Sequence, residues 1–87
     1  MLSKFLKMSI VETTGPSNYT TGGFDVQVGE LTIVEHAIVQ LGGGYIGEVA
    51  GKNGNTITIK AYTSAGTEVT DGTDLSSVNV TIIAFGH

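Results

Sequence analysis

The chain has 87 residues and a mass of 9.0 kDa, enough for one compact domain and too few for a two-domain enzyme with an interdomain cleft. With 40% hydrophobic and 14% charged residues it has a globular composition, and no apolar run reaches the length of a membrane helix. Four lysines, no arginine and eight acidic residues give a net charge of −4, the wrong sign for neutralising phosphates. We therefore expect neither nucleic acid nor a membrane as a partner.

The residue usage predicts an all-β fold. Thirteen glycines and twelve threonines against one proline are typical of short strands joined by tight turns. The chain has no cysteine, so a disulfide cannot stabilise this small domain, and packing or self-association must do so. We expect a small antiparallel β-sandwich or flattened β-barrel of about six to seven strands. Residues 1–87 would form one domain, with 1–14 as an arm or an edge strand.

The first two predicted strands precede residue 30. Leu6, Met8 and Ile10 share one face of the first strand and alternate with polar residues, up to a break at residues 15–18. Residues 24–28 alternate in the same way after two glycines and predict a half-buried second strand.

Residues 31–41 fit either a helix or a strand. A stripe of five apolar residues followed by Gly42 favours a helix. Five β-branched residues and the lack of a good N-cap favour a strand, which is our prediction. Both faces would be partly apolar, so we expect the strand to be covered on both sides. One face would carry Leu31, Ile33, Ala37 and Val39, and the other Val34, His36 and Ile38.

A β-hairpin is predicted around Lys52-Asn53-Gly54, since Asn-Gly between alternating segments is a strong hairpin signal. Its second strand would turn Ile57, Ile59 and Ala61 inward. A long polar connection over residues 64–77 leads to the last strand. That strand would carry Val78, Val80, Ile82 and Ala84 on one face, and Asn79, Thr81, Ile83 and Phe85 on the other.

Two sequence patterns resemble features of enzymes, but neither has the context that an enzyme would need. Residues 42–47 match the glycine spacing of a dinucleotide-binding turn, but the chain continues into a hairpin strand where that turn needs a helix. His36 and His87 have no sequence-local partners arranged as a catalytic triad. We therefore expect no catalytic residues, no cofactor and no enzymatic activity.

Acidic residues gather in the long polar connection. Glu68, Asp71 and Asp74 could supply oxygen ligands for calcium, but their spacing fits no EF-hand. We interpret Asp71 as a turn residue beside Gly72 and Asp74 as a partner of the backbone near residue 76. No metal site is expected.

Aromatic and aliphatic residues are the better leads to a binding surface. Tyr19, Tyr45 and Tyr62 could stack on sugar rings, although we interpret them as half-buried residues at sheet edges or subunit contacts. Ile83 and Phe85 form a second apolar face on the last strand, and monomers rarely leave such faces exposed. They are either part of the core or part of an interface.

Several runs resemble small structural proteins of tailed bacteriophages. The resemblance covers residues 15–87 and ends in the aliphatic last strand. It is carried by turn sequences and strand entries: Gly23-Phe24-Asp25-Val26, Gly66-Thr67-Glu68-Val69, Asp71-Gly72-Thr73-Asp74-Leu75-Ser76 and Ile82-Ile83-Ala84-Phe85-Gly86. It implies a capsid decoration (cement) protein on the virion surface, which binds and stabilises the assembled shell of the major capsid protein. The alternative is a tail or fibre-tip module that binds host-surface glycans.

The expected mode of action is adhesion. We expect a homo-oligomer, with a trimer favoured, or neighbouring copies on the shell, and we expect edge strands to take part in docking. The interface residues that we predict are Phe5, Leu6, Tyr45, Tyr62, Ile83 and Phe85.

Overall fold

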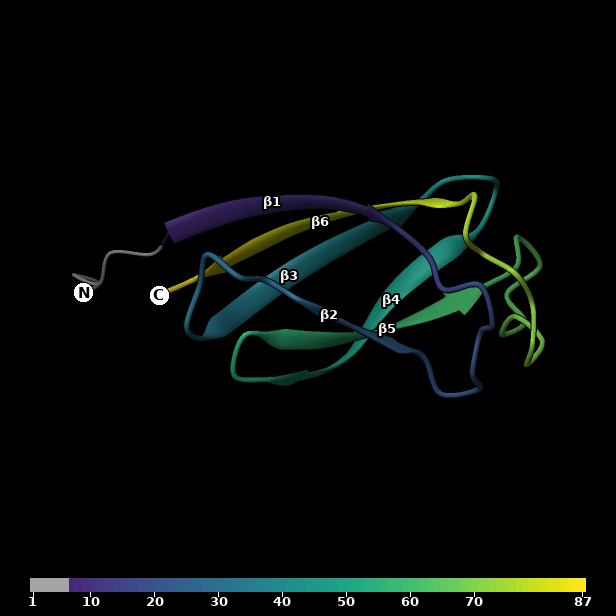
Figure 1. Ribbon diagram of the computed structural model, residues 1–87, viewed down its shortest axis with the longest axis horizontal. Coiled ribbons are helices and arrows are strands. Elements are labelled where there is room, and N and C mark those ends of the chain that lie inside the picture. The colour runs from purple at the N-terminus through teal and green to yellow at the C-terminus, as the bar shows by residue number, and fades with distance from the viewer. Residues whose placement is uncertain (1–6) are drawn as a thin grey trace.

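The computed structural model describes residues 7–87 and forms a sandwich of two antiparallel three-stranded sheets (Figure 1). One sheet has the order β1-β6-β3 and the other the order β2-β5-β4. The strands are β1 (Lys7–Thr14), β2 (Phe24–Gln27), β3 (Val34–Leu41), β4 (Ile46–Asn53), β5 (Thr56–Tyr62) and β6 (Asn79–Gly86). This confirms the prediction of a small all-β sandwich. None of these described residues forms a helix long and apolar enough to cross a membrane.

The core lies between the two central strands. Strict alternation turns every second residue of β5 and of β6 toward the opposite sheet, as the sequence predicted. The buried residues of these two strands are Ile57, Ile59, Ala61, Val80, Ile82 and Ala84. Loop residues close the ends of the core, among them Tyr19, Val28 and Leu75. A continuous apolar core of this kind is what holds a domain without disulfides together.

The segment over residues 31–41 confirms the strand and corrects its facing. A β-bulge between Val34 and His36 places Val34 opposite Gly86 and His36 opposite Phe85. Val34 is therefore buried on the inward side, and the predicted grouping of Val34 with His36 and Ile38 was wrong. The expectation of cover on both sides was also wrong within the described chain, because Ile38 remains 63% exposed.

The predicted hairpin is confirmed as β4 and β5. Gly54 supplies the positive φ of 64° in the turn, a conformation that side chains disfavour. The polar connection after β5 forms one isolated bridge with the end of that strand, between Glu68 and Tyr62, and is held by backbone and side-chain hydrogen bonds. Leu75 N donates to Pro16 O at 2.8 Å, which ties this connection to the segment between β1 and β2.

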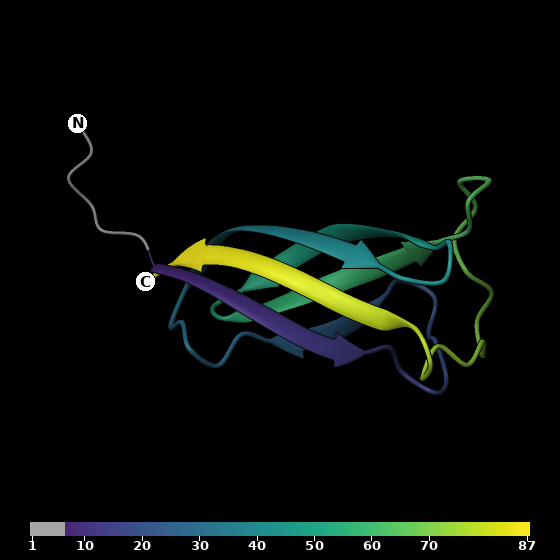
Figure 2. The ribbon, with the colours of Figure 1, turned by 90° about the horizontal axis from the view of Figure 1, so that it is seen from above.

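The two sides of the sandwich differ. β3 packs closely on β4 and β5 of the other sheet, whereas β1 makes no close backbone contact with any strand of that sheet. Figure 2 shows β1, β6 and β3 side by side in front of the other sheet, with β1 at the edge. Among residues 7–87, β1 therefore pairs with a strand on one side only.

Candidate interaction surface

Two rows of mostly apolar side chains cross the outward face of the β1-β6-β3 sheet. In the first row Met8 lies opposite Phe85, and Phe85 lies opposite His36. In the second row Ile10, Ile83 and Ile38 are aligned in the same way across the three strands. Side chains aligned across antiparallel strands are close neighbours, so the rows form one surface. We name it the apolar patch: Met8, Ile10, Ile38, Ile83 and Phe85.

The apolar patch is exposed to solvent. Ile38 is 63%, Met8 60% and Ile10 55% exposed, although each is a large hydrophobic residue. Ile83 and Phe85 are half-buried because they lie on the central strand, between the other two. Large contiguous apolar surfaces on monomers commonly mark interaction sites.

The patch ends at a polar third row, in which Glu12, Thr81 and Gln40 are aligned. Next to it lies a surface groove lined by residues 12–14 of β1 and residues 79–81 of β6. The outward face of this sheet is therefore apolar at one end and polar at the other.

A long-range hydrogen bond explains why Met8 and Ile10 face outward. Ser9, between Met8 and Ile10, points inward and is buried, and its hydroxyl donates a hydrogen bond to Glu30 at 2.8 Å. A polar residue takes the inward position because Glu30 satisfies it, so the two large apolar side chains must point out. Met8 and Ile10 share a face as predicted. Leu6, predicted to share it, lies outside the described residues.

The structure brings together two of the predicted interface residues. Ile83 and Phe85 are the centre of the apolar patch. Tyr62 lies on the outward face of the other sheet, where its hydroxyl donates to Glu48 at 2.7 Å. Tyr45 lies between β3 and β4 and packs against the core. Phe5, like Leu6, lies outside the described residues.

Sequence reasoning did not single out Met8, Ile10 or Ile38 as interface residues. Their strands were predicted, but the outward direction of each side chain depends on how the two edge strands pair with β6. The available signal was the presence of apolar residues on both faces of residues 31–41.

The three tyrosines do not form a common surface. Tyr19 is fully buried, so its interpretation as a half-buried edge residue was wrong. Its hydroxyl donates to Glu68 at 2.8 Å and accepts the N–H of Ala61 at 3.1 Å. Burial raises the pKa of Tyr19, and the neighbouring Glu68 carboxylate adds to this. With Tyr19 inside and Tyr62 on the other sheet, no aromatic platform for sugars is built from them.

The acidic residues of the polar connection act as hydrogen-bond acceptors. Glu68 accepts the backbone N–H of Gly22 at 2.8 Å and the Tyr19 hydroxyl, and these bonds lower the pKa of Glu68. Asp74 accepts the Ser76 hydroxyl at 2.6 Å and the Ser76 backbone N–H at 2.9 Å, as predicted. The hydroxyl bond, followed by the N–H bond, lowers the pKa of Asp74. Within residues 7–87 no three acidic or histidine residues gather to hold a metal ion.

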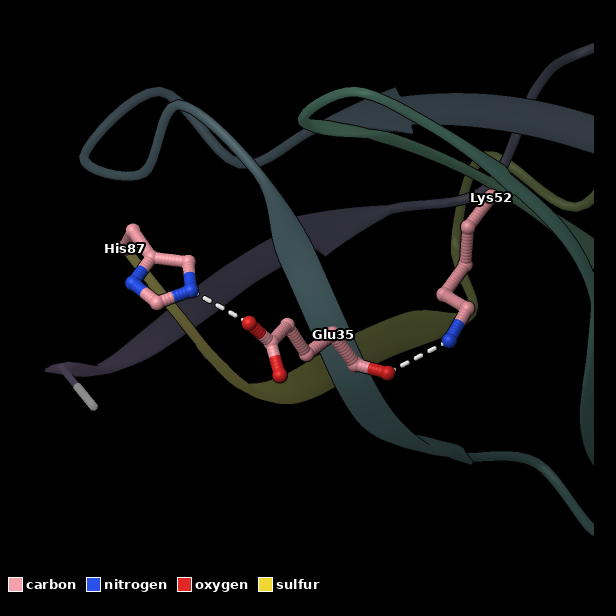
Figure 3. Close-up of polar contacts among 3 residues, drawn as sticks. All are labelled: Glu35, Lys52 and His87. Carbon is pink, nitrogen blue, oxygen red and sulfur yellow. Dashed lines mark hydrogen bonds and ion pairs between the residues drawn. The ribbon is translucent and has the colours of Figure 1, made fainter. Parts of the chain in front are cut away.

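A polar cluster joins the bulged start of β3 to the chain end and to β4. Figure 3 shows the Glu35 carboxylate against Nε2 of His87, while Lys52 Nζ donates to the backbone carbonyl of Glu35. No hydroxyl of the described residues hydrogen-bonds to the His87 ring. His36 lies beside Phe85 on the outward face. Because these contacts link β3 to β4 and to the end of the chain, the cluster has the geometry of a structural tie.

Comparison with protein-family models, with curated proteins and with solved structures finds no match for this chain.

Proposed function

We propose that this chain is a non-enzymatic capsid decoration protein that docks on an assembled viral shell through the apolar patch. The observation that carries the proposal is the exposed pair of apolar rows on the β1-β6-β3 sheet. The resemblance of residues 15–87 to phage structural proteins supplies the partner, the assembled major capsid protein.

The chemistry of the patch suits docking on a protein. An aliphatic and aromatic surface lowers its free energy by leaving water, and docking costs little backbone entropy because the strands of the sheet are already ordered. Polar residues at its end, such as Glu12 and Gln40, supply the rim that protein interfaces usually have.

Stabilisation of the shell would follow from linkage. A protein that binds the assembled shell and not its separate subunits shifts the equilibrium toward the shell. The contribution of each copy can be small, since many copies act on one particle. No covalent step is needed.

The test compares two charge insertions on opposite faces. Ile38→Lys places a cation in the apolar patch at an exposed position, and Thr56→Lys places the same charge on the outward face of the other sheet. We expect Ile38→Lys to weaken binding to purified shells by at least about tenfold in a co-sedimentation assay. Thr56→Lys should bind like the unmodified protein.

Unassembled capsid subunits immobilised on beads are compared with shells immobilised in the same way, and we expect the subunits to retain much less protein. Equal binding of the Ile38→Lys variant to shells would contradict docking through the patch. If the unmodified protein binds neither shells nor subunits, it is not a capsid decoration protein.

A further inference from the structure

β1 is an unprotected strand edge within residues 7–87. It has β6 on one side, and neither sheet of the described chain supplies a strand on its other side. Natural edge strands are often protected by short length, proline, bulges or charges. β1 runs for eight residues, pairs with β6 without a register shift, contains no proline and is uncharged from Met8 to Val11. It therefore offers an open edge to another strand.

The free hydrogen-bonding groups of this edge follow from the pairing on the other side. In an antiparallel ladder, the backbone N–H and C=O of alternate residues point to the same neighbouring strand. Gly15 continues the register of β1 opposite Val78 and donates its N–H to Val78 O at 3.1 Å. The odd-numbered residues of β1 therefore point these groups toward β6. Met8, Ile10 and Glu12 point theirs to the open edge, and their side chains are exposed.

Ile10 lies in the middle of the open edge. Directly opposite residues of antiparallel strands share a face, so a second copy of β1 can pair only where even-numbered residues meet even-numbered ones. Centring the pairing on Ile10 sets residues 7–13 of one copy opposite residues 13–7 of the other. We propose that this chain forms a two-fold dimer through β1, in which Ile10 lies opposite Ile10 of the second copy.

A row of isoleucines supports this register. Ile38, Ile83 and Ile10 are aligned across β3, β6 and β1. Centring on Ile10 continues the row in reverse order across the second copy, over one sheet with three strands from each copy. Aligned β-branched side chains on neighbouring strands stabilise a sheet. Ile10 is 55% exposed in the single chain, so this contact would remove apolar surface from water.

The two neighbouring registers fit less well. Centring on Val11 would set Ile10 against the Glu12 carboxylate and interrupt the isoleucine row. Centring on Ser9 would pair only residues 7–11 of the described strand. In the Ile10 register Glu12 lies opposite Met8, near each end of the pairing, where the carboxylate can stay in water.

The dimer would also cover the open side of the sandwich. Val11, Phe24 and Val26 pack against the core but are only partly buried, and they belong to the edge strands β1 and β2. A strand of the second copy beside β1 would remove more of Val11 from water. The pairing uses the β1 edge of both copies, so the assembly closes at two.

The dimer is compatible with the proposed function and does not depend on it. A two-fold axis between directly opposite strands is perpendicular to the sheet, so both apolar patches lie on the same side of the dimer. The dimer would present its two patches together, and docking of one copy would raise the effective concentration of the other at the shell.

Substitutions at Ile10 test the axis, because this residue would face itself. We expect sedimentation velocity to give twice the 9.0 kDa mass for the full chain. Ile10→Lys and Ile10→Glu should each raise the dimer dissociation constant at least about tenfold, since like charges would meet. An equimolar mixture of the two variants should restore a dimer. Ile38→Lys, the same change at an exposed position of β3, is the control and should remain dimeric.

Proline substitutions separate pairing between copies from folding. Glu12→Pro removes an N–H that points to the open edge, so the domain should fold while the dimer dissociation constant rises at least about tenfold. Thr13→Pro removes an N–H that points to β6 and should destabilise the domain itself. Circular dichroism measures folding, and sedimentation velocity measures the mass.

A monomeric full chain at roughly 100 µM, a trimeric mass, or a mixture of the two Ile10 variants that stays monomeric would overturn the dimer. Ile38→Lys separates this proposal from shell docking, since it should remain dimeric while losing the shell. A chain that docks on shells as a monomer would refute the dimer alone.

Discussion

The two outward faces of the sandwich are built from the same kind of strand but differ in chemistry, although the β2-β5-β4 face also carries one exposed large hydrophobic residue, Ile46. On the β2-β5-β4 sheet, polar side chains bond one another across the strands, as Thr58 does with Asp25 at 2.7 Å and Tyr62 with Glu48 at 2.7 Å. On the β1-β6-β3 sheet, the aligned side chains of the first two rows are apolar apart from His36. The polar side chains of the β2-β5-β4 face hydrogen-bond to one another, so this face is satisfied in water. The apolar face has no partner within residues 7–87.

Substitutions on the inward and outward sides of β6 should differ most in their effect on the free energy of unfolding. Ile82→Ala removes a fully buried side chain and should lower the free energy of unfolding by about 2–4 kcal/mol. Ile83→Ala, the next residue, lies on the outward face and should cost less than about 1.5 kcal/mol. Urea denaturation of both variants measures the difference. Equal losses would mean that the outward row belongs to the core and not to an interface.

A smaller loss of stability is expected when polar residues replace apolar ones on the outward face of the β1-β6-β3 sheet. The double variant Ile38→Thr/Ile83→Thr keeps β-branched side chains on both strands and should lower the free energy of unfolding by less than about 1 kcal/mol. Thermal denaturation measures this, and co-sedimentation with shells should show reduced binding. A loss above about 2 kcal/mol would show that the patch supports the fold.

The smallest change in stability is expected at high pH, from a hydrogen bond on the outward face of the β2-β5-β4 sheet. The Glu48 carboxylate accepts the Tyr62 hydroxyl and raises the pKa of Tyr62 from 10.0 to about 12. Since the folded pKa is raised, this bond stabilises the fold below pH 10 and its contribution is lost as the pH rises through 10 toward 12.

Ultraviolet absorbance of the phenolate follows this titration, with Tyr62→Phe identifying its signal among the three tyrosines. Glu48→Gln should return the pKa of Tyr62 toward 10.0, because it removes the charge that opposes ionisation. An unchanged titration in Glu48→Gln would place the cause elsewhere.

The strands of this fold were largely predictable, because alternation and turn residues are local signals. The inward rows of β5 and β6 and the Asn-Gly hairpin followed directly from the sequence. The bulge at Val34 was not predictable, since it depends on how β3 pairs with the end of β6. Gly86 lies so close to the Ile33 carbonyl that a side chain there would collide with it, and a single sequence does not reveal that contact.

The candidate surface was predictable only in part, for a similar reason. Ile83 and Phe85 were visible as a second apolar face of one strand. Whether Met8 and Ile10 point outward depends on Ser9, which faces inward because Glu30, 21 residues away, accepts its hydroxyl. Long-range partners of this kind decide the facing of an edge strand, and alternation alone gives two equivalent answers.

In the proposed docking, the apolar face lies against the shell and the polar face does not. The most direct measurement is a cryo-electron microscopy reconstruction of shells of the proposed source virus. Docking through the apolar patch predicts many copies per particle, each with Ile38, Ile83 and Phe85 buried against the major capsid protein and with Tyr62 facing solvent. A reconstruction in which the β2-β5-β4 sheet lies on the shell, or in which the protein is absent from the shell, would refute docking through the apolar patch.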